Sequence, residues 1–180
     1  MKSMGSDLWI FGYGSLIFRV DFPFAERVPA TLRHWSRRFW QGSADHRGTE
    51  DFPGRVVTLV STPDINCWGM AYKIKAADVE AVLDHLDYRE KGGYQRLEAP
   101  LELDTGEQIT GLTYLAVQDN PMFIGEAPLL DMVKQISNAV GPSGPNRDYL
   151  LKLEASLKQH GVADDHVFQL AEALRGFESR

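Results

Sequence analysis

The chain has 180 residues, of which 43% are hydrophobic and 24% charged, so it is long enough to bury a core and we expect one domain over residues 1–180. Its net charge of −6 disfavours nucleic acid as the main partner. The single cysteine, Cys67, excludes an internal disulfide, and no apolar run reaches the roughly 20 residues that span a bilayer, so we expect a cytoplasmic protein without membrane contact.

The N-terminal part predicts a short strand followed by a glycine-rich loop. Residues 1–7 are expected to be flexible, and the apolar run 8–11 is too short for the core of a signal peptide. After it comes Phe11-Gly-Tyr-Gly-Ser-Leu16, where glycines allow positive φ angles and a close approach of backbone N–H groups to a ligand. A long strand is predicted over residues 29–41.

The middle of the chain predicts strands that flank one helix. Two β-branched runs, 55–60 and 67–74, read as strands joined by a turn at 62–66. Within 76–88 the apolar residues fall at helical spacing, and Gly92-Gly93 ends the helix. The stripe consists of Val79, Val82, Leu83 and Leu86.

The remainder predicts a hairpin and then helices. Strands over 94–103 and 107–117 flank a turn at 104–106. Two helical stripes follow, and Asn146 is expected to cap the second helix. A last helix is predicted near 165–174. This order indicates an α+β fold, with a small mixed sheet, closed or strongly curved, surrounded by helices. The stripes are Leu129, Leu130, Val133 and Ile136, and then Leu150, Leu151, Leu153 and Leu157.

The glycine loop fits none of the common nucleotide or nucleophile motifs. Ile17 stands where a dinucleotide fingerprint has its third glycine, and the Gly-Lys-Ser/Thr ending of a P-loop is absent. Ser15 is not in a Gly-x-Ser-x-Gly elbow. Two interpretations remain open, a tight turn after a strand and a loop whose N–H groups bind a carboxylate.

Glu90 is the candidate general base. It follows the predicted helix, four residues after Leu86 and therefore on the same face, so its side chain can point inward. A carboxylate desolvated there would suit proton transfer near neutral pH. The alternative is an ordinary solvated glutamate beside Arg89 and Lys91.

The segment 43–48 offers no metal site. His46 has no second histidine or cysteine at ligand spacing and no adjacent nucleophile. A loop held by hydrogen bonds from Asp45 is the favoured interpretation. Arg47 and Arg55 are candidates for contact with an anionic substrate, and Tyr149 for contact with its distal end.

Six blocks, in order, resemble the ChaC-type γ-glutamylcyclotransferase family, and the resemblance covers nearly the whole chain. Phe18 and Val20 depart from the family pattern, outside the proposed catalytic position. The blocks are Phe11-Gly-Tyr-Gly-Ser-Leu16, Trp35-Ser-Arg-Arg-Phe-Trp-Gln-Gly-Ser43, Asp45-His-Arg-Gly48, Pro53-Gly-Arg-Val-Val-Thr-Leu59, Arg89-Glu-Lys-Gly-Gly-Tyr94 and Gly141-Pro-Ser-Gly-Pro-Asn146.

The resemblance implies a γ-glutamylcyclotransferase-like fold and an enzyme that releases 5-oxoproline and cysteinylglycine from glutathione. It implies Glu90 as proton acceptor, binding of the γ-glutamyl group by residues 10–15, and no metal or organic cofactor. The oligomeric state is left open. The candidate substrate-binding residues are Ile10, Phe11, Gly12, Tyr13, Gly14, Ser15, Leu16, Arg47, Arg55, Tyr94 and Tyr149.

The chemistry agrees with these residue types. In a γ-glutamyl amide, the substrate's own α-amine can attack its γ-carbonyl, so no enzyme nucleophile is required. Positioning, proton transfer and oxyanion stabilisation remain for the protein. The alternatives are another γ-glutamyl amino acid or amine as substrate, and a non-catalytic protein that binds γ-glutamyl compounds or carboxylates.

Overall fold

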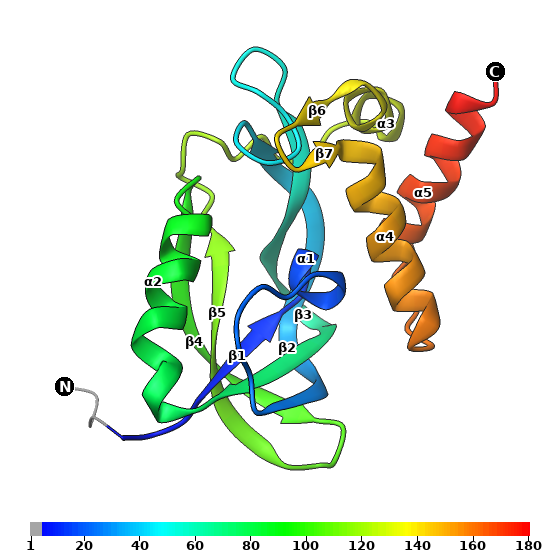
Figure 1. Cartoon of the computed structure of the whole chain (residues 1–180). Helices are drawn as coiled ribbons and strands as arrows, with labels where there is room; N and C mark the ends of the chain where they lie inside the picture. Colours follow the sequence, from blue (N-terminus) through cyan, green and yellow to red (C-terminus); the bar gives the residue numbers. More distant parts are fainter. Residues whose placement is uncertain (1–4) are drawn as a thin grey trace. The chain divides into compact units, whose positions relative to one another are not determined.

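The computed structural model describes residues 5–180 (Figure 1), which group into two compact units. The first contains the chain up to Ser36 together with Val60–Leu115, and the second contains Arg37–Leu59 and Ala116–Arg180. The expectation of a single domain over 1–180 stays a prediction. No helix in the described part of the chain is long and apolar enough to cross a membrane.

Five strands form a closed barrel in the order β1-β3-β2-β4-β5. β1 pairs antiparallel with β3, and it runs parallel to β5, where Ile10 lies opposite Leu112. The barrel is therefore mixed and closed, as the order of strands predicted. The strands are β1 (Leu8–Gly12), β2 (Glu26–Ser43), β3 (Gly54–Ile74), β4 (Tyr94–Leu103) and β5 (Gln108–Ala116).

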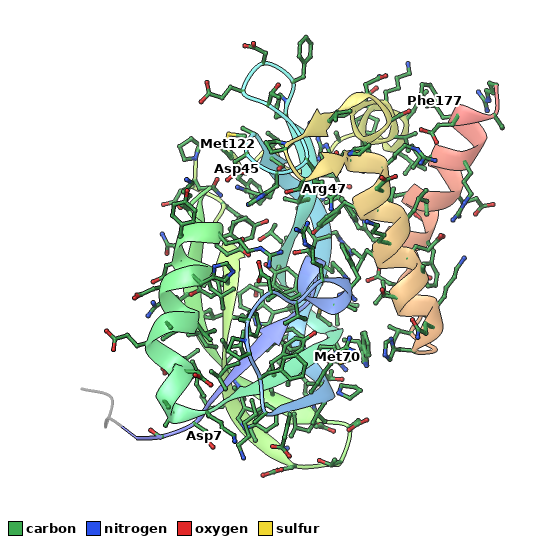
Figure 2. All side chains as sticks on the ribbon, in the orientation of Figure 1. Asp7, Asp45, Arg47, Met70, Met122 and Phe177 are labelled. Carbon is green, nitrogen blue, oxygen red and sulfur yellow. The ribbon has the colours of Figure 1, made fainter. Side chains whose placement is uncertain are left out.

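The core of the first unit joins the barrel to α2 (Val79–Arg89), which lies along β4 in Figure 1. A 3-10 turn, η1 (Ala76–Asp78), precedes this helix. The predicted stripe is confirmed, because α2 buries Val82, Leu83 and Leu86 against barrel residues, with Val79 partly buried. The buried barrel residues in this core include Ile10, Met70, Tyr72, Ile74 and Leu112; Figure 2 labels Met70.

The predicted turn at 62–66 is wrong, because β3 runs unbroken through it. Pro63 and Asp64 lie in an exposed part of the strand, where a proline removes no buried hydrogen bond. Asp64 takes a φ of 65°, a left-handed conformation that aspartate tolerates. The turn-forming residues thus distort the strand locally and do not end it.

The other boundaries of the first unit agree with the prediction. α2 ends at Arg89, and Gly93 follows with a φ of 105°. Gly106, with a φ of 90°, closes the β4–β5 hairpin, and its N–H donates to the Leu103 carbonyl at 2.9 Å. At the start of the unit, the carboxylate of Asp7, which Figure 2 labels, accepts from the Ala76 N–H at 2.9 Å.

The second unit contains the predicted helices, which are α3 (Leu129–Asn138), α4 (Asn146–Gln159) and α5 (Asp165–Glu178). They pack together (Figure 1). Between α3 and α4 lies a two-stranded sheet of β6 (Val140–Gly141) and β7 (Gly144–Pro145). A short helix, α1 (Ser15–Phe18), belongs to the first unit. The buried faces consist of Met132, Val133, Ile136, Leu150, Leu153, Leu157, Val167, Leu170 and Leu174.

Two predictions about these helices need correction. Leu129 and Leu130 are 43% and 49% exposed, because they lie in the first turn of α3, and the buried stripe begins at Met132. Asn146 does not cap α4. Its fully buried side chain instead accepts from the Arg55 N–H and donates to the Arg55 carbonyl, both at 2.8 Å.

Candidate functional site

Glu90 lies directly after α2, at the base of the turn that leads into β4. Its N–H donates to the Leu86 carbonyl at 2.8 Å, and its carbonyl accepts from the Tyr94 N–H at 3.3 Å. The Glu90 side chain is 19% exposed. The carboxylate is therefore largely desolvated yet reachable, as expected of a group at the end of the buried face of α2.

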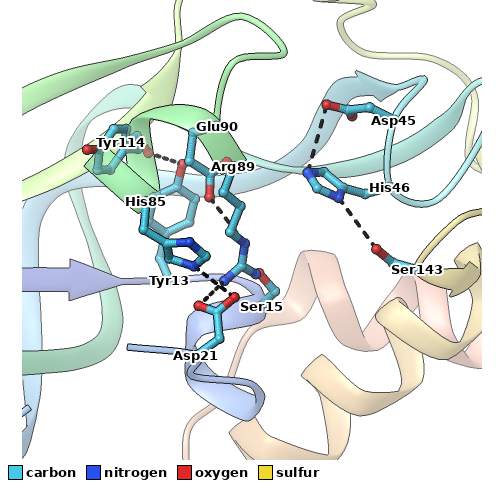
Figure 3. Close-up of polar contacts among 10 residues, drawn as sticks. All are labelled: Tyr13, Ser15, Asp21, Asp45, His46, His85, Arg89, Glu90, Tyr114 and Ser143. Atoms are coloured by element: carbon cyan, nitrogen blue, oxygen red, sulfur yellow. Dashed lines mark hydrogen bonds and ion pairs between the residues drawn. The ribbon is translucent and has the colours of Figure 1, made fainter. Parts of the chain in front are cut away.

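Arg89 connects Glu90 to the glycine loop (Figure 3). Its Nη2 donates to Ser15 Oγ at 2.6 Å, and its Nη1 donates to Asp21 Oδ1 at 3.2 Å. Its Nε lies 3.9 Å from Glu90 Oε1, and the Arg89 side chain is only 15% exposed. The structure thus gathers Glu90 and Ser15, both predicted site residues, around one guanidinium group.

Asp21 carries a second basic partner, since His85 Nε2 lies 3.0 Å from its Oδ2 (Figure 3). Partial burial opposes ionisation, but the hydrogen bond from His85 and the charge of Arg89 outweigh it and hold the pKa of the Asp21 carboxyl below its usual range. The sequence analysis missed both Arg89 and Asp21. For Arg89 the signal was its position inside the fifth block of the family resemblance, next to the proposed base.

The glycine loop is mostly buried and depends on close contact. Ile10 and Phe11 lie in β1 and are buried, and Ser15 is half-buried. A Cβ at Gly12 would lie 2.4 Å from the Cβ of Leu16, so only glycine fits. Of the two properties that glycine allows here, positive φ is not used, because neither Gly12 nor Gly14 has one. Close approach is what requires the glycine.

Two tyrosines hold the loop to the barrel and the barrel to α2. The Tyr13 hydroxyl donates to the Tyr114 carbonyl at 2.5 Å (Figure 3). The Tyr114 hydroxyl donates to Asp87 Oδ1 at 2.6 Å. Burial and the hydrogen bond to Asp87 raise the pKa of Tyr114, so this hydroxyl stays protonated and acts as a donor. Tyr94, half-buried, begins β4.

The remaining predicted residues, Arg47, Arg55 and Tyr149, belong to the second unit, and all three are buried. Arg47 Nη1 donates to the Pro145 carbonyl at 3.2 Å, and its guanidinium lies 5.6 Å from the centre of the Tyr149 ring. The Tyr149 hydroxyl accepts from the Val57 N–H at 3.3 Å. In these contacts Arg47 and Tyr149 bind each other and the backbone.

Arg55 is held by neutral oxygens. Its Nε donates to Gln135 Oε1 at 2.7 Å, and its Nη1 donates to the carbonyls of Phe39 and Gly125 at 2.9 and 2.8 Å. Burial lowers the pKa of the guanidinium from its usual value. The side chain thus joins three segments of the second unit.

His46 lies between two polar side chains of the second unit (Figure 3). Its Nε2 is 3.8 Å from Asp45 Oδ2, and its Nδ1 is 3.5 Å from Ser143 Oγ. Both distances exceed those of an activated nucleophile and its base. Among residues 5–180, no group of three or more histidine, cysteine, aspartate or glutamate side chains could hold a metal ion.

Comparisons with known proteins agree on one family. The model of the family described as ChaC-like protein matches residues 8–176. γ-Glutamylcyclotransferase 2-3 of Arabidopsis thaliana is 47% identical over 93% of this chain and 88% of its own length. Human glutathione-specific γ-glutamylcyclotransferase 1 is 39% identical over 93% of this chain and 78% of its own.

A solved structure of a related enzyme has the same fold. The solved structure of a yeast γ-glutamylcyclotransferase specific to glutathione superposes with a TM-score of 0.90 and 28% identity. It covers 96% of this chain and 97% of the yeast chain. The expected γ-glutamylcyclotransferase-like fold is therefore confirmed.

Proposed function

The chain belongs to the ChaC-like protein family, and from this premise we propose that it is a γ-glutamylcyclotransferase acting on glutathione. The observation that carries the proposal is the largely buried Glu90 carboxylate, joined through Arg89 to Ser15 of the glycine loop. Relatives named as glutathione-specific enzymes support the choice of substrate.

In the proposed reaction, the γ-glutamyl group binds along residues 10–16 with its α-amine next to Glu90. Glu90 accepts a proton from the α-ammonium, and the free amine attacks the γ-carbonyl carbon to form a tetrahedral intermediate. The γ-amide C–N bond then breaks, and Glu90 gives its proton to the departing nitrogen of cysteinylglycine. The ring nitrogen loses its second proton to the released amine, so that the products are a neutral lactam and an ammonium group. The other product is 5-oxoproline, and one carboxylate serves both proton transfers.

The protein contributes mainly by holding the substrate in the ring-closing shape. Correct orientation alone is worth about 7–11 kcal/mol in such intramolecular reactions. Donors aimed at the γ-carbonyl oxygen lower the barrier further, because negative charge develops there. We assign the donors for this oxygen and for the substrate carboxylate to the loop 13–15. The roles expected for Arg47, Arg55, Tyr94 and Tyr149, and the cytoplasmic location, stay predictions.

The direct test is to incubate the purified protein with reduced glutathione and follow 5-oxoproline and cysteinylglycine by mass spectrometry. We expect both products in equal amounts from the parent protein. Glu90→Gln should keep the fold and lose turnover by about 10²–10⁴-fold, the range typical of a general acid–base group. The matched control is Glu80→Gln, which changes an exposed glutamate of the same helix and should leave turnover within about twofold.

Each other outcome has a definite meaning. Glu90→Gln with activity within a few-fold of the parent would exclude Glu90 as the base. A folded parent that converts γ-glutamyl amino acids or amines but not glutathione would change the substrate and keep the reaction. A folded parent protein that forms no product from any of these compounds would favour the alternative of a non-catalytic protein that binds γ-glutamyl compounds or carboxylates.

A further inference from the structure

The Ser15 hydroxyl can donate one hydrogen bond in addition to the one that it accepts. Its oxygen accepts the hydrogen bond from Arg89 Nη2 at 2.6 Å. A hydroxyl also carries one proton to donate, and no acceptor for that proton is found among residues 5–180. Because Arg89 occupies a lone pair of the oxygen, the O–H is directed away from the guanidinium. The hydroxyl is therefore set as a donor toward a group outside the chain.

Arg89 can hold this geometry because it is itself held. Asp21 accepts from its Nη1 at 3.2 Å, and His85 Nε2 lies 3.0 Å from the other oxygen of Asp21. The guanidinium is a planar fork that donates to two partners at once, whereas a lysine ammonium is a point charge on a flexible stem. Asp21 and Ser15 thus determine where the fork lies.

The same guanidinium places a positive charge near the proposed base. Its Nε is 3.9 Å from Glu90 Oε1, and both side chains are largely buried, at 15% and 19% exposed. The guanidinium therefore lies beside the carboxylate that accepts the proton in the proposed reaction. The charged or titratable groups that contact Arg89 in these interactions are Asp21 and Glu90, with His85 behind Asp21.

We propose that Arg89 is a positioning residue of the reaction. Held by Asp21, it orients the Ser15 hydroxyl as a donor to the γ-glutamyl group and keeps a positive charge beside Glu90. This inference rests on the proposed function and deepens it, because Arg89 would link Ser15 of the glycine loop to the base, Glu90.

A double-mutant cycle tests the coupling. We would measure kcat and KM for glutathione in the parent, Ser15→Ala, Arg89→Ala and the double variant, with Arg89→Lys and Asp21→Asn alongside. Arg89→Ala and Arg89→Lys should each lower kcat/KM by about 10- to 100-fold, and Asp21→Asn by less. The double variant should lose at least about fivefold less than the product of the single losses, because both changes remove the same interaction.

Arg33→Ala is the matched control, since Arg33 forms an exposed ion pair with Glu102 elsewhere in the same unit. It should leave kcat/KM within about twofold. Thermal unfolding of every variant separates loss of fold from loss of function. If Arg89→Ala does not fold, Arg89→Lys takes its place in the double-mutant cycle.

Chemical rescue gives a readout that a merely structural role would not change. Guanidinium ion in the millimolar range should restore part of the activity of Arg89→Ala, and sodium at the same ionic strength should not. The double variant should gain less, because Ser15 is absent.

Multiplicative losses in the cycle, or a folded Arg89→Ala with activity within twofold of the parent, would overturn this inference while leaving the proposed function intact. A folded parent that forms no 5-oxoproline from glutathione would overturn the proposed function and the inference together.

Discussion

At the scale of single residues, Arg55 in the second unit shows how a buried charge can be held without a carboxylate. Arg55 is 5% exposed and donates to one side-chain amide oxygen and two backbone carbonyls. Each of these oxygens would be left without this donor if the guanidinium were removed, and an unsatisfied buried acceptor costs about 1–3 kcal/mol. Arg55 is therefore a structural clamp, whatever it contributes to binding.

Arg55→Lys should lower the free energy of unfolding by about 1–3 kcal/mol, because the ammonium keeps the charge but cannot reach all three oxygens. Urea denaturation followed by circular dichroism measures the loss. Arg33→Lys, on the exposed side chain of the first unit, is the control and should change stability by less than about 0.5 kcal/mol. Equal effects of the two substitutions would contradict the clamp.

At the scale of elements, α5 is joined to β2 by polar groups as well as by its apolar face. His166 Nε2 accepts from the Phe39 N–H at 2.9 Å, and the buried Arg37 donates to Asp164 at 2.9 Å. Burial, reinforced by the positive charge of Arg38, lowers the pKa of His166 from 6.5 to about 4. A neutral imidazole is required, since only an unprotonated Nε2 can accept the bond from Phe39.

This contact predicts a loss of stability in mild acid. Because the pKa of His166 is lower in the folded chain than in the unfolded chain, the unfolded chain takes up the proton first as pH falls. The stabilisation is complete above pH 6.5 and decreases as the pH approaches 4. Urea unfolding between pH 7.5 and 4.5 should show a shallower decline for His166→Gln than for the parent, whereas His160→Gln, on an exposed residue, should follow the parent.

The accuracy of the sequence-based predictions depended on the range of the interaction. The stripe of α2 and the β4–β5 hairpin were predicted because spacing and turn glycines act within a few residues. The turn at 62–66 was predicted wrongly, because pairing along β3 overrode Pro63 and Asp64. Asn146 was mistaken for a cap because its partner, Arg55, lies 91 residues away. Arg89 was overlooked for the same reason, since Ser15 and Asp21 precede it by 74 and 68 residues.

At the scale of the whole molecule, the distribution of donor groups predicts how the enzyme responds to chelators. No cluster within residues 5–180 offers three metal-ligating side chains, and the proposed reaction needs only proton transfer and oriented donors. Glutathione turnover should therefore be unchanged, within about twofold, after treatment with excess EDTA and gel filtration. A loss that added Mg²⁺ or Zn²⁺ restores would contradict the mechanism.

The two units are interleaved along the chain, and this has a consequence for synthesis on the ribosome. Residues 37–59 of the second unit emerge early, but their partners in 116–180 follow only after most of the first unit has been made. The acceptor for the Phe39 N–H, for example, is His166, which is synthesised 127 residues later. At about 5–20 residues per second, synthesis of these 127 residues takes roughly 6–25 seconds, during which the second unit is incomplete. Residues 37–59 therefore remain without these native partners until the C-terminal helices have been made.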